Sequence, residues 1–219
     1  MENENVLEAI KQAILSADAE GVKAAIAAAL DAGVEPTDIL SLGITGAMQA
    51  VGEKWNAKEF WLPDVMAAAD TVKQGIDFLK PRMALGQAGS TGTVVIGTVK
   101  GDIHSVGKNL VATFLGASGF EVYDLGEDIP AEKFIEAVEE HDADIVAMSC
   151  FSTNVTPVMI EINDQLKEKG LRDKVFTMIG GVAMAPNWAA RVGADAFAGD
   201  AHEASETARA HMAQKVAAG

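Results

Sequence analysis

The hydrophobic pattern changes near residue 92, and this change restricts the possible folds more than any other feature. From there on, five short apolar runs alternate with segments that have helical spacing. Such runs are typical of strands that helices cover on both faces. Five strand–helix units predict a parallel, doubly wound sheet, for which we expect strand order 2-1-3-4-5. The expected strands are 93–99, 121–125, 144–149, 175–180 and 195–198, and the expected helices are about 106–118, 131–141, 156–169, 187–192 and 202–216.

Residues 1–80 carry helical periodicity only. Asp18 suits the N-cap of a second helix that Gly33 would end, and Pro36 and Pro63 suit the first turns of two more. Four helices with short connections predict a small antiparallel bundle. In the third helix the residues expected to face inward are Ile39, Leu40, Ile44, Met48 and Val51.

A glycine-rich stretch of small and polar residues, 84–92, separates the two patterns and predicts a linker. We therefore expect an α/β protein of two domains: a four-helix bundle at 1–88, then a flavodoxin-like (Rossmann-like) five-stranded domain at 89–219.

Composition excludes several classes of function. The net charge of −15 is spread over both domains, which argues against binding nucleic acid through its phosphates. One cysteine rules out an internal disulfide. The acidic, polar start is unlike a secretory signal, and no apolar run approaches membrane-spanning length. We expect a cytoplasmic protein that binds neither nucleic acid nor membrane.

Chemistry-bearing residues follow three of the expected strands, at the edge where open α/β sheets bind ligands. The first loop holds Asp102 and His104, and a histidine so placed can bind a metal through one ring nitrogen while the carboxylate holds the other. The second loop holds Ser149 and further hydroxyls, and the third a pair of glycines. Each loop alone is a weak signal, so a flavodoxin-like domain with an accidental motif remains an alternative.

Taken together, Asp-x-His-x-x-Gly, the serine loop and Gly-Gly resemble the cobalamin-binding domain. The resemblance implies a cobalamin or related corrinoid bound base-off/His-on, with His104 as the lower ligand of cobalt and Asp102 bonded to its other ring nitrogen. Ser105 and Gly107 belong to the same motif. The nucleotide tail of the cofactor would occupy a slot formed by Ser149, Thr153, Gly180, Gly181 and Ala201.

Two positions depart from the family pattern. The usual leucine after Ser-x is Phe151, and a serine that extends the hydrogen-bond chain behind the aspartate is replaced by Val155. The chain of proton carriers either ends at Asp102 or continues through Ser152, Thr156 or water.

The stretch 51–65 resembles the helical cap shared by methionine synthase and the corrinoid proteins of anaerobic methyltransferase systems. The resemblance implies that Trp55 and Leu62, with Val65 and Met66 beside them, cover the upper face of the corrin. The alternative is that these side chains form ordinary bundle core.

The resemblance as a whole implies a methyl carrier rather than a complete catalyst. A donor-specific methyltransferase would place a methyl group on Co(I), and an acceptor methyltransferase of the tetrahydrofolate or coenzyme M type would remove it from methyl-Co(III). A reductive activation protein would repair oxidised cobalt, and residues 84–92 would act as a hinge. The alternatives are the small subunit of an adenosylcobalamin-dependent mutase and a cobalamin-sensing regulator.

Overall fold

The computed structural model describes residues 2–83 and 91–218. The chain divides into two compact units, one containing the residues up to 90 and the other those from 91 except 116–119. Most of the predicted linker, 84–90, lies outside the described residues. No described helix is both long and apolar enough to cross a lipid bilayer.

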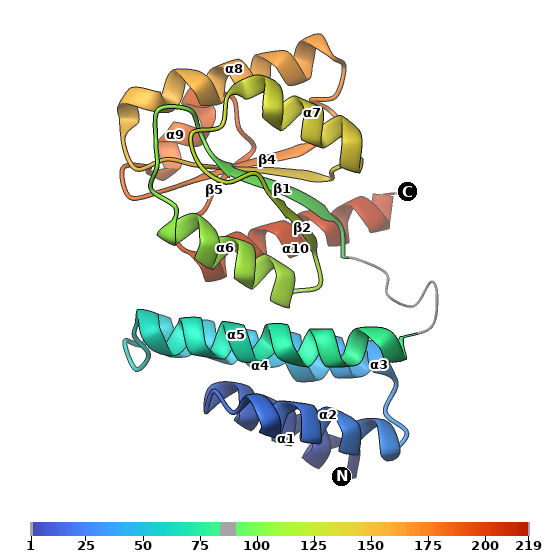
Figure 1. Ribbon diagram of the computed structural model, residues 1–219. Helices are drawn as coiled ribbons and strands as arrows, with labels where there is room; N and C mark the ends of the chain where they lie inside the picture. The colour runs from blue at the N-terminus through green and yellow to red at the C-terminus, as the bar shows by residue number, and fades with distance from the viewer. Residues whose placement is uncertain (1, 84–90, 219) are drawn as a thin grey trace. The chain divides into compact units, whose positions relative to one another are not determined.

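The first unit is built from helices only (Figure 1). Among its long helices, α1 packs on α2 and α4, and α5 packs on the same two helices. Asp18 caps α2 by accepting a hydrogen bond from the Gly21 N–H at 2.9 Å, and Pro63 lies in the first turn of α5, as predicted. The elements are α1 (Glu2–Leu15), α2 (Ala19–Asp31), α3 (Pro36–Asp38), η1 (Ile39–Thr45), α4 (Gly46–Asn56), α5 (Leu62–Leu79) and η2 (Lys80–Arg82).

The third predicted helix is interrupted by one wide, π-helical segment, η1. Ile39 and Ile44 are buried as expected, whereas Leu40 is only half-buried. A π turn adds a residue to the helical repeat, so it shifts which side chains point inward. The regular 3.6-residue spacing assumed for this segment was therefore wrong at Leu40.

The second unit is a five-stranded parallel sheet between two layers of helices, in the predicted order β2-β1-β3-β4-β5. Helices α7 and α8 cover one face and α6 and α10 the other (Figure 1). The strands are β1 (Thr93–Thr98), β2 (Glu121–Asp124), β3 (Ile145–Ser149), β4 (Phe176–Gly180) and β5 (Ala196–Phe197). The helices are α6 (Val106–Ala117), α7 (Ala131–His141), η3 (Thr153–Val155), α8 (Thr156–Glu168), α9 (Pro186–Val192) and α10 (Ala201–Ala218).

Each face of the sheet has its own apolar core. Val95, Val146 and Ile179 face a cluster that includes Phe134 of α7. Val94, Ile145 and Met178 face the cluster on the α6 and α10 side, which includes Leu115 and Ala208. Burial on both faces fixes the register of the strands, and hence the height at which each strand ends.

Candidate functional site

The ends of the three central strands bring the predicted loops together. In the parallel ladder Thr98 of β1 pairs with Ser149 of β3, which in turn pairs with Gly180 of β4. The loops that leave these residues therefore start side by side at the carboxyl edge of the sheet, which is where doubly wound sheets bind ligands.

Asp102 and His104 form a bonded pair at this edge. The ring Nδ1 of His104 lies 2.7 Å from Asp102 Oδ1, and the same oxygen accepts the His104 backbone N–H at 2.9 Å. The Asp102 side chain is 3% exposed and that of His104 58%. Because the carboxylate holds Nδ1 as a donor, Nε2 is left as the nitrogen with a free lone pair for a metal.

Hydrogen bonds stabilise the ionised form of the buried Asp102 carboxyl. Burial raises the pKa of this carboxyl, but the N–H groups of Phe151 and His104 and the His104 ring outweigh it. The pKa of Asp102 is therefore lowered overall. A carboxylate that stays ionised keeps the histidine proton on Nδ1.

The loop after β2 fixes the turn that leads into this pair. The Asp128 carboxylate accepts the Gly101 N–H at 2.7 Å, and the Asp128 N–H donates to the Asp102 carbonyl at 3.0 Å. From the sheet side, the Thr98 hydroxyl donates to the His104 carbonyl at 3.1 Å. The backbone around His104 is thus bonded to β1 and to the loop after β2.

An ion pair with a buried lysine anchors the first turn of α6, directly after the histidine. The Lys108 side chain is 2% exposed, and its Nζ lies 2.6 Å from Asp124 Oδ1 and 2.7 Å from Asn109 Oδ1. Asp124 Oδ1 also accepts the Gly126 N–H at 2.9 Å. This pair joins α6 to the end of β2.

Exposed apolar side chains surround the pair at the same edge. They lie in the segments after β1, β3 and β4, and we call them the apolar rim: Ile103 (71% exposed), Val106 (64%), Phe151 (46%) and Val182 (82%). Large apolar side chains in this number at one edge indicate a surface that something apolar covers. The predicted site residues did not include Ile103, Val106 and Val182. The sequence feature that could have pointed to them is their position in glycine-containing loops.

Two further residues of the Asp102 motif lie at the start of α6. The Ser105 carbonyl accepts the Asn109 N–H at 2.8 Å and so begins the helix. Gly107 is exposed, and a Cβ built there would have no atom within 4 Å. Packing within the protein therefore gives no reason for glycine at position 107, although glycine weakens a helix.

The residues predicted for the tail slot come from the next three strand ends. Ser149 is half-buried, Thr153 is exposed at the start of η3, and Ala201 is buried at the start of α10. A Cβ at Gly181, where φ is +128°, would lie 1.7 Å from the Cys150 carbonyl oxygen, and one at Gly180 would lie 3.1 Å from the Ala198 carbonyl oxygen. The close approach of these backbones is by itself a reason for both glycines.

Behind Asp102 the hydrogen bonds end on the main chain. Asp102 Oδ2 accepts the Phe151 N–H. The Ser152 hydroxyl accepts the Asn154 N–H, and the Thr156 hydroxyl donates to the Thr153 carbonyl at 2.8 Å, so neither hydroxyl is bonded to Asp102.

Val155 lies against the same loop. A Cβ at Gly101 would come 3.1 Å from Val155 Cγ1, and Val155 packs on the apolar core. An apolar side chain thus borders the turn where the family pattern has a hydroxyl.

Cys150 is a buried thiol beside the site. Burial, aided by the negative charge of Asp102, raises the pKa of Cys150 to about 11 against a weaker opposing hydrogen bond from Ser152. The thiol is therefore protonated at neutral pH, which makes it a poor nucleophile.

In the helical unit, the predicted cap residues lie around the turn between α4 and α5. Trp55 and Leu62 are half-buried, and Met66 is exposed. Val65 is 1% exposed and lies on the buried stripe of α5 with Ala68, Ala69 and Val72, so it packs as core.

Comparison with known proteins identifies both units. Models of the B12 binding domain match residues 92–209 and, separately, residues 6–80. A trimethylamine corrinoid protein of Methanosarcina barkeri is 41% identical over 95% of this chain and 97% of its own length. Dimethylamine corrinoid protein 1 of Methanosarcina acetivorans is 37% identical over 97% of this chain and 100% of its own length.

Solved structures agree with these matches. A cobalamin-binding protein from Desulfitobacterium hafniense is similar with a TM-score of 0.80 at 30% identity, covering 93% of this chain and 97% of that one. A chain of the methanol:cobalamin methyltransferase complex MtaBC from Methanosarcina barkeri gives a TM-score of 0.83 at 29% identity, covering 95% of this chain and 80% of that one.

Proposed function

Because the chain belongs to the family of B12-binding corrinoid proteins of methyltransferase systems, we propose that it carries a methyl group between two methyltransferases on a bound corrinoid. One observation of the site carries this proposal. An exposed histidine, bonded through Nδ1 to the buried Asp102, lies next to the apolar rim.

The residues at the carboxyl edge of the sheet fit a corrinoid. A corrin is a broad, largely apolar ring that brings its own four equatorial nitrogen ligands, so the protein needs to supply one axial nitrogen and an apolar bed. His104 offers Nε2, and the apolar rim offers the bed. The open space over Gly107 leaves room where a side chain would stand in the way.

When bound, the corrinoid supplies a cobalt ion that accepts a methyl group in the Co(I) state and gives it up to an acceptor. His104 would bind this cobalt from below in the base-off/His-on form, while Asp102 holds the proton on Nδ1. Displacement of the cofactor's own base leaves a nucleotide tail, for which the slot residues Ser149, Thr153, Gly180, Gly181 and Ala201 are the proposed contacts. The rim would exclude water from the bound corrinoid.

The relatives suggest the donor. Those at 41% and 37% identity are named for trimethylamine and dimethylamine, and a structural neighbour belongs to a methanol:cobalamin methyltransferase complex. We take a methylamine, with trimethylamine first, as the donor, transferred by a donor-specific methyltransferase. The acceptor methyltransferase is of the tetrahydrofolate or coenzyme M type, and a reductive activation protein restores Co(I).

The test loads the chain with hydroxocobalamin and reduces it with titanium(III) citrate. A trimethylamine:corrinoid methyltransferase and trimethylamine should then remove the Co(I) absorption, whereas methanol with its own methyltransferase should act more slowly. Methyl iodide serves as the control that the reduced protein can accept a methyl group. Failure to accept a methyl group from any donor, with adenosylcobalamin as the native cofactor, would instead support the mutase alternative.

We further propose that Trp55 and Leu62 shield the upper face of the corrin, as the resemblance of stretch 51–65 implies. Apolar cover slows the reaction of Co(I) with oxygen and water. Trp55→Ala should speed air oxidation of the reduced, loaded protein, and Trp55→Phe should restore most of the protection. An unchanged rate in Trp55→Ala would remove the shielding role.

A further inference from the structure

Phe151 makes two separate contacts with the Asp102–His104 pair. Its ring is stacked on the His104 imidazole, with ring centroids 4.1 Å apart and planes at 15°. Its backbone N–H donates to Asp102 Oδ2. One residue from the loop after β3 thus contacts both members of a pair that comes from the loop after β1.

The imidazole needs a second contact because one hydrogen bond does not fix the plane of a ring. The bond from Nδ1 to Asp102 restrains one atom, and the ring can still tilt about the line that joins Nδ1 to the carboxylate. With 58% of its side chain exposed, His104 is not held by surrounding core. A flat group against one face prevents this tilt, and parallel aromatic rings attract each other when offset.

The Phe151 ring is available for this task. It is 46% exposed and is not part of the apolar core clusters of the α/β unit, although its backbone is bonded to Asp102. The preceding residue, Cys150, is bonded to β4 through its N–H and the Gly180 carbonyl at 3.1 Å. The backbone that carries the ring is therefore held by β4 on one side and by Asp102 on the other. A leucine at this position could contact His104 but could not stack parallel to it.

We propose that Phe151 is a positioning residue for the metal ligand: its stacked ring holds the His104 imidazole at the tilt that directs Nε2 toward cobalt. This inference rests on the proposed corrinoid function. It predicts that the fraction of loaded protein with histidine bound depends on an aromatic ring at position 151, beyond any effect on folding.

The first test uses the protein without cofactor. A stacked ring shifts the ring protons of its partner upfield, so the His104 signals in the proton NMR spectrum should be displaced and should return toward ordinary values in Phe151→Leu. The chain has four histidines, which single His→Gln variants assign. Unshifted His104 signals in the wild type would overturn the stacking and the proposal with it.

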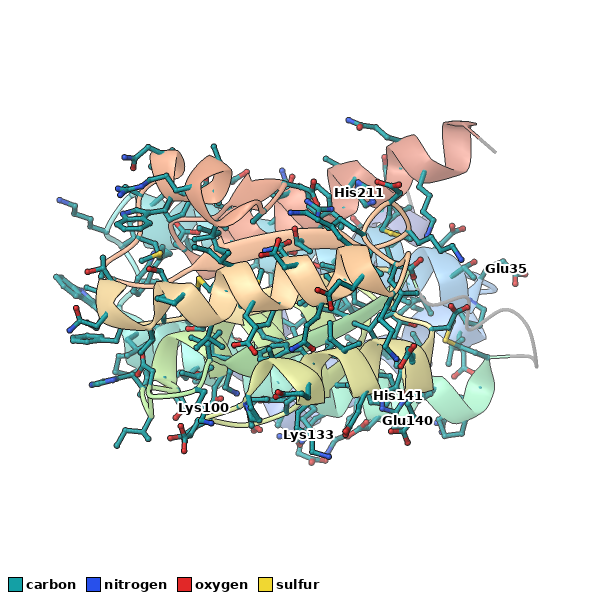
Figure 2. All side chains as sticks on the ribbon, turned by 90° about the horizontal axis from the view of Figure 1, so that it is seen from above. Glu35, Lys100, Lys133, Glu140, His141 and His211 are labelled. Carbon is teal, nitrogen blue, oxygen red and sulfur yellow. The ribbon has the colours of Figure 1, made fainter. Side chains whose placement is uncertain are left out.

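The chain offers a matched control stack. Phe176 and His211 have ring centroids 4.1 Å apart and planes at 14°. Figure 2 shows His211 at the opposite end of the α/β unit from Lys100, which precedes Asp102 and His104 in the chain. Phe176→Leu should move the His211 signals and leave those of His104 unchanged.

The second test uses the protein loaded with cobalamin and reduced to Co(II). Electron paramagnetic resonance measures the ratio of histidine-off to histidine-on cobalt. Phe151→Leu should raise this ratio about two- to twelvefold, the range expected for loss of an aromatic pair. Phe151→Tyr should restore it, because the ring is kept.

The outcomes separate this inference from the proposed function. A wild type that binds no cobalamin, or shows no axial nitrogen, contradicts the proposed function. A wild type with histidine bound, and a ratio in Phe151→Leu equal to that of the wild type and Phe151→Tyr, overturns the role of Phe151 alone.

Discussion

The isolated fold does not explain why position 107 is a glycine. It lies in the first turns of α6, a Cβ there would touch nothing, and alanine is the better helix former. Glycine lets a ligand come close to the backbone. We propose that the corrin occupies the space beside Gly107.

We therefore expect a substitution of Gly107 to stabilise the empty protein and to weaken its binding of cobalamin. Gly107→Ala should raise the unfolding free energy of the empty protein by about 0.5 kcal/mol, because the unfolded chain loses freedom, and should weaken cobalamin binding. Gly116→Ala is the matched control on the same helix, where a Cβ also meets no atom within 4 Å. Urea unfolding and equilibrium dialysis measure the two quantities, and unchanged cobalamin affinity in Gly107→Ala would contradict the assignment.

Among the elements, α6 lies nearest to His104 in the chain, because it begins two residues later, at Val106. The buried Lys108 ammonium joins its first turn to Asp124 at the end of β2. Lys108 is almost fully buried whereas the Asp124 side chain is 37% exposed. The lysine charge therefore needs its partner more than the aspartate charge does, because water reaches Asp124. Removing the counter-charge of a buried cation costs more than removing the cation itself.

This inequality can be measured. Asp124→Ala should lower the unfolding free energy by about 3 kcal/mol, because it leaves a buried ammonium without a carboxylate. Lys108→Met should cost about 1 kcal/mol or less, since the methionine fills the same space and Asp124 can turn to solvent. Urea unfolding of both variants and of the double variant tests this, and equal costs for the two single substitutions would rule out the unequal dependence.

Some of these elements could be predicted from the sequence and others could not. The strands and their order follow from short apolar runs, and the Asp102–His104 pair follows from local spacing. The π segment at η1, the Asp128 contact with Gly101 and the Phe151 stack do not, because each depends on packing between segments far apart in the chain. Glycine at 181 was predicted for a ligand slot, but its distance to the Cys150 carbonyl shows a cause inside the protein.

At the scale of the whole molecule, the chain is acidic, and one of its carboxylates links two strands. The chain carries 32 Asp and Glu against 17 Lys and Arg. Asp195 ties the starts of β4 and β5 together by accepting the Thr177 N–H at 2.7 Å and pairing with Arg172 at 2.7 Å. Burial raises the pKa of Asp195, but the Arg172 and Thr177 hydrogen bonds outweigh it, so the pKa lies below its ordinary 3.8.

A lowered carboxyl pKa determines the direction in which stability changes with pH. The folded state binds this proton less readily than the unfolded state, so the stabilisation by Asp195 is fully present above its ordinary pKa of 3.8 and is lost as the pH falls through the lower folded value. Asp195→Asn should lower the unfolding free energy at pH 7 by about 1–2 kcal/mol. The difference from the wild type should shrink below pH 3.8. A difference that stays constant with pH in urea unfolding would argue against this ion pair.

The proposed role of His104 as the lower ligand of cobalt has a direct test in the electron paramagnetic resonance spectrum of the loaded Co(II) protein. Protein made with ¹⁵N-histidine distinguishes a histidine nitrogen from the nitrogen of the cofactor's own base. We predict that this labelling converts each three-line axial splitting into a two-line splitting, and that His104→Ala abolishes the histidine splitting. A three-line splitting that persists in the labelled protein would show that the cofactor keeps its own base, and would contradict the account.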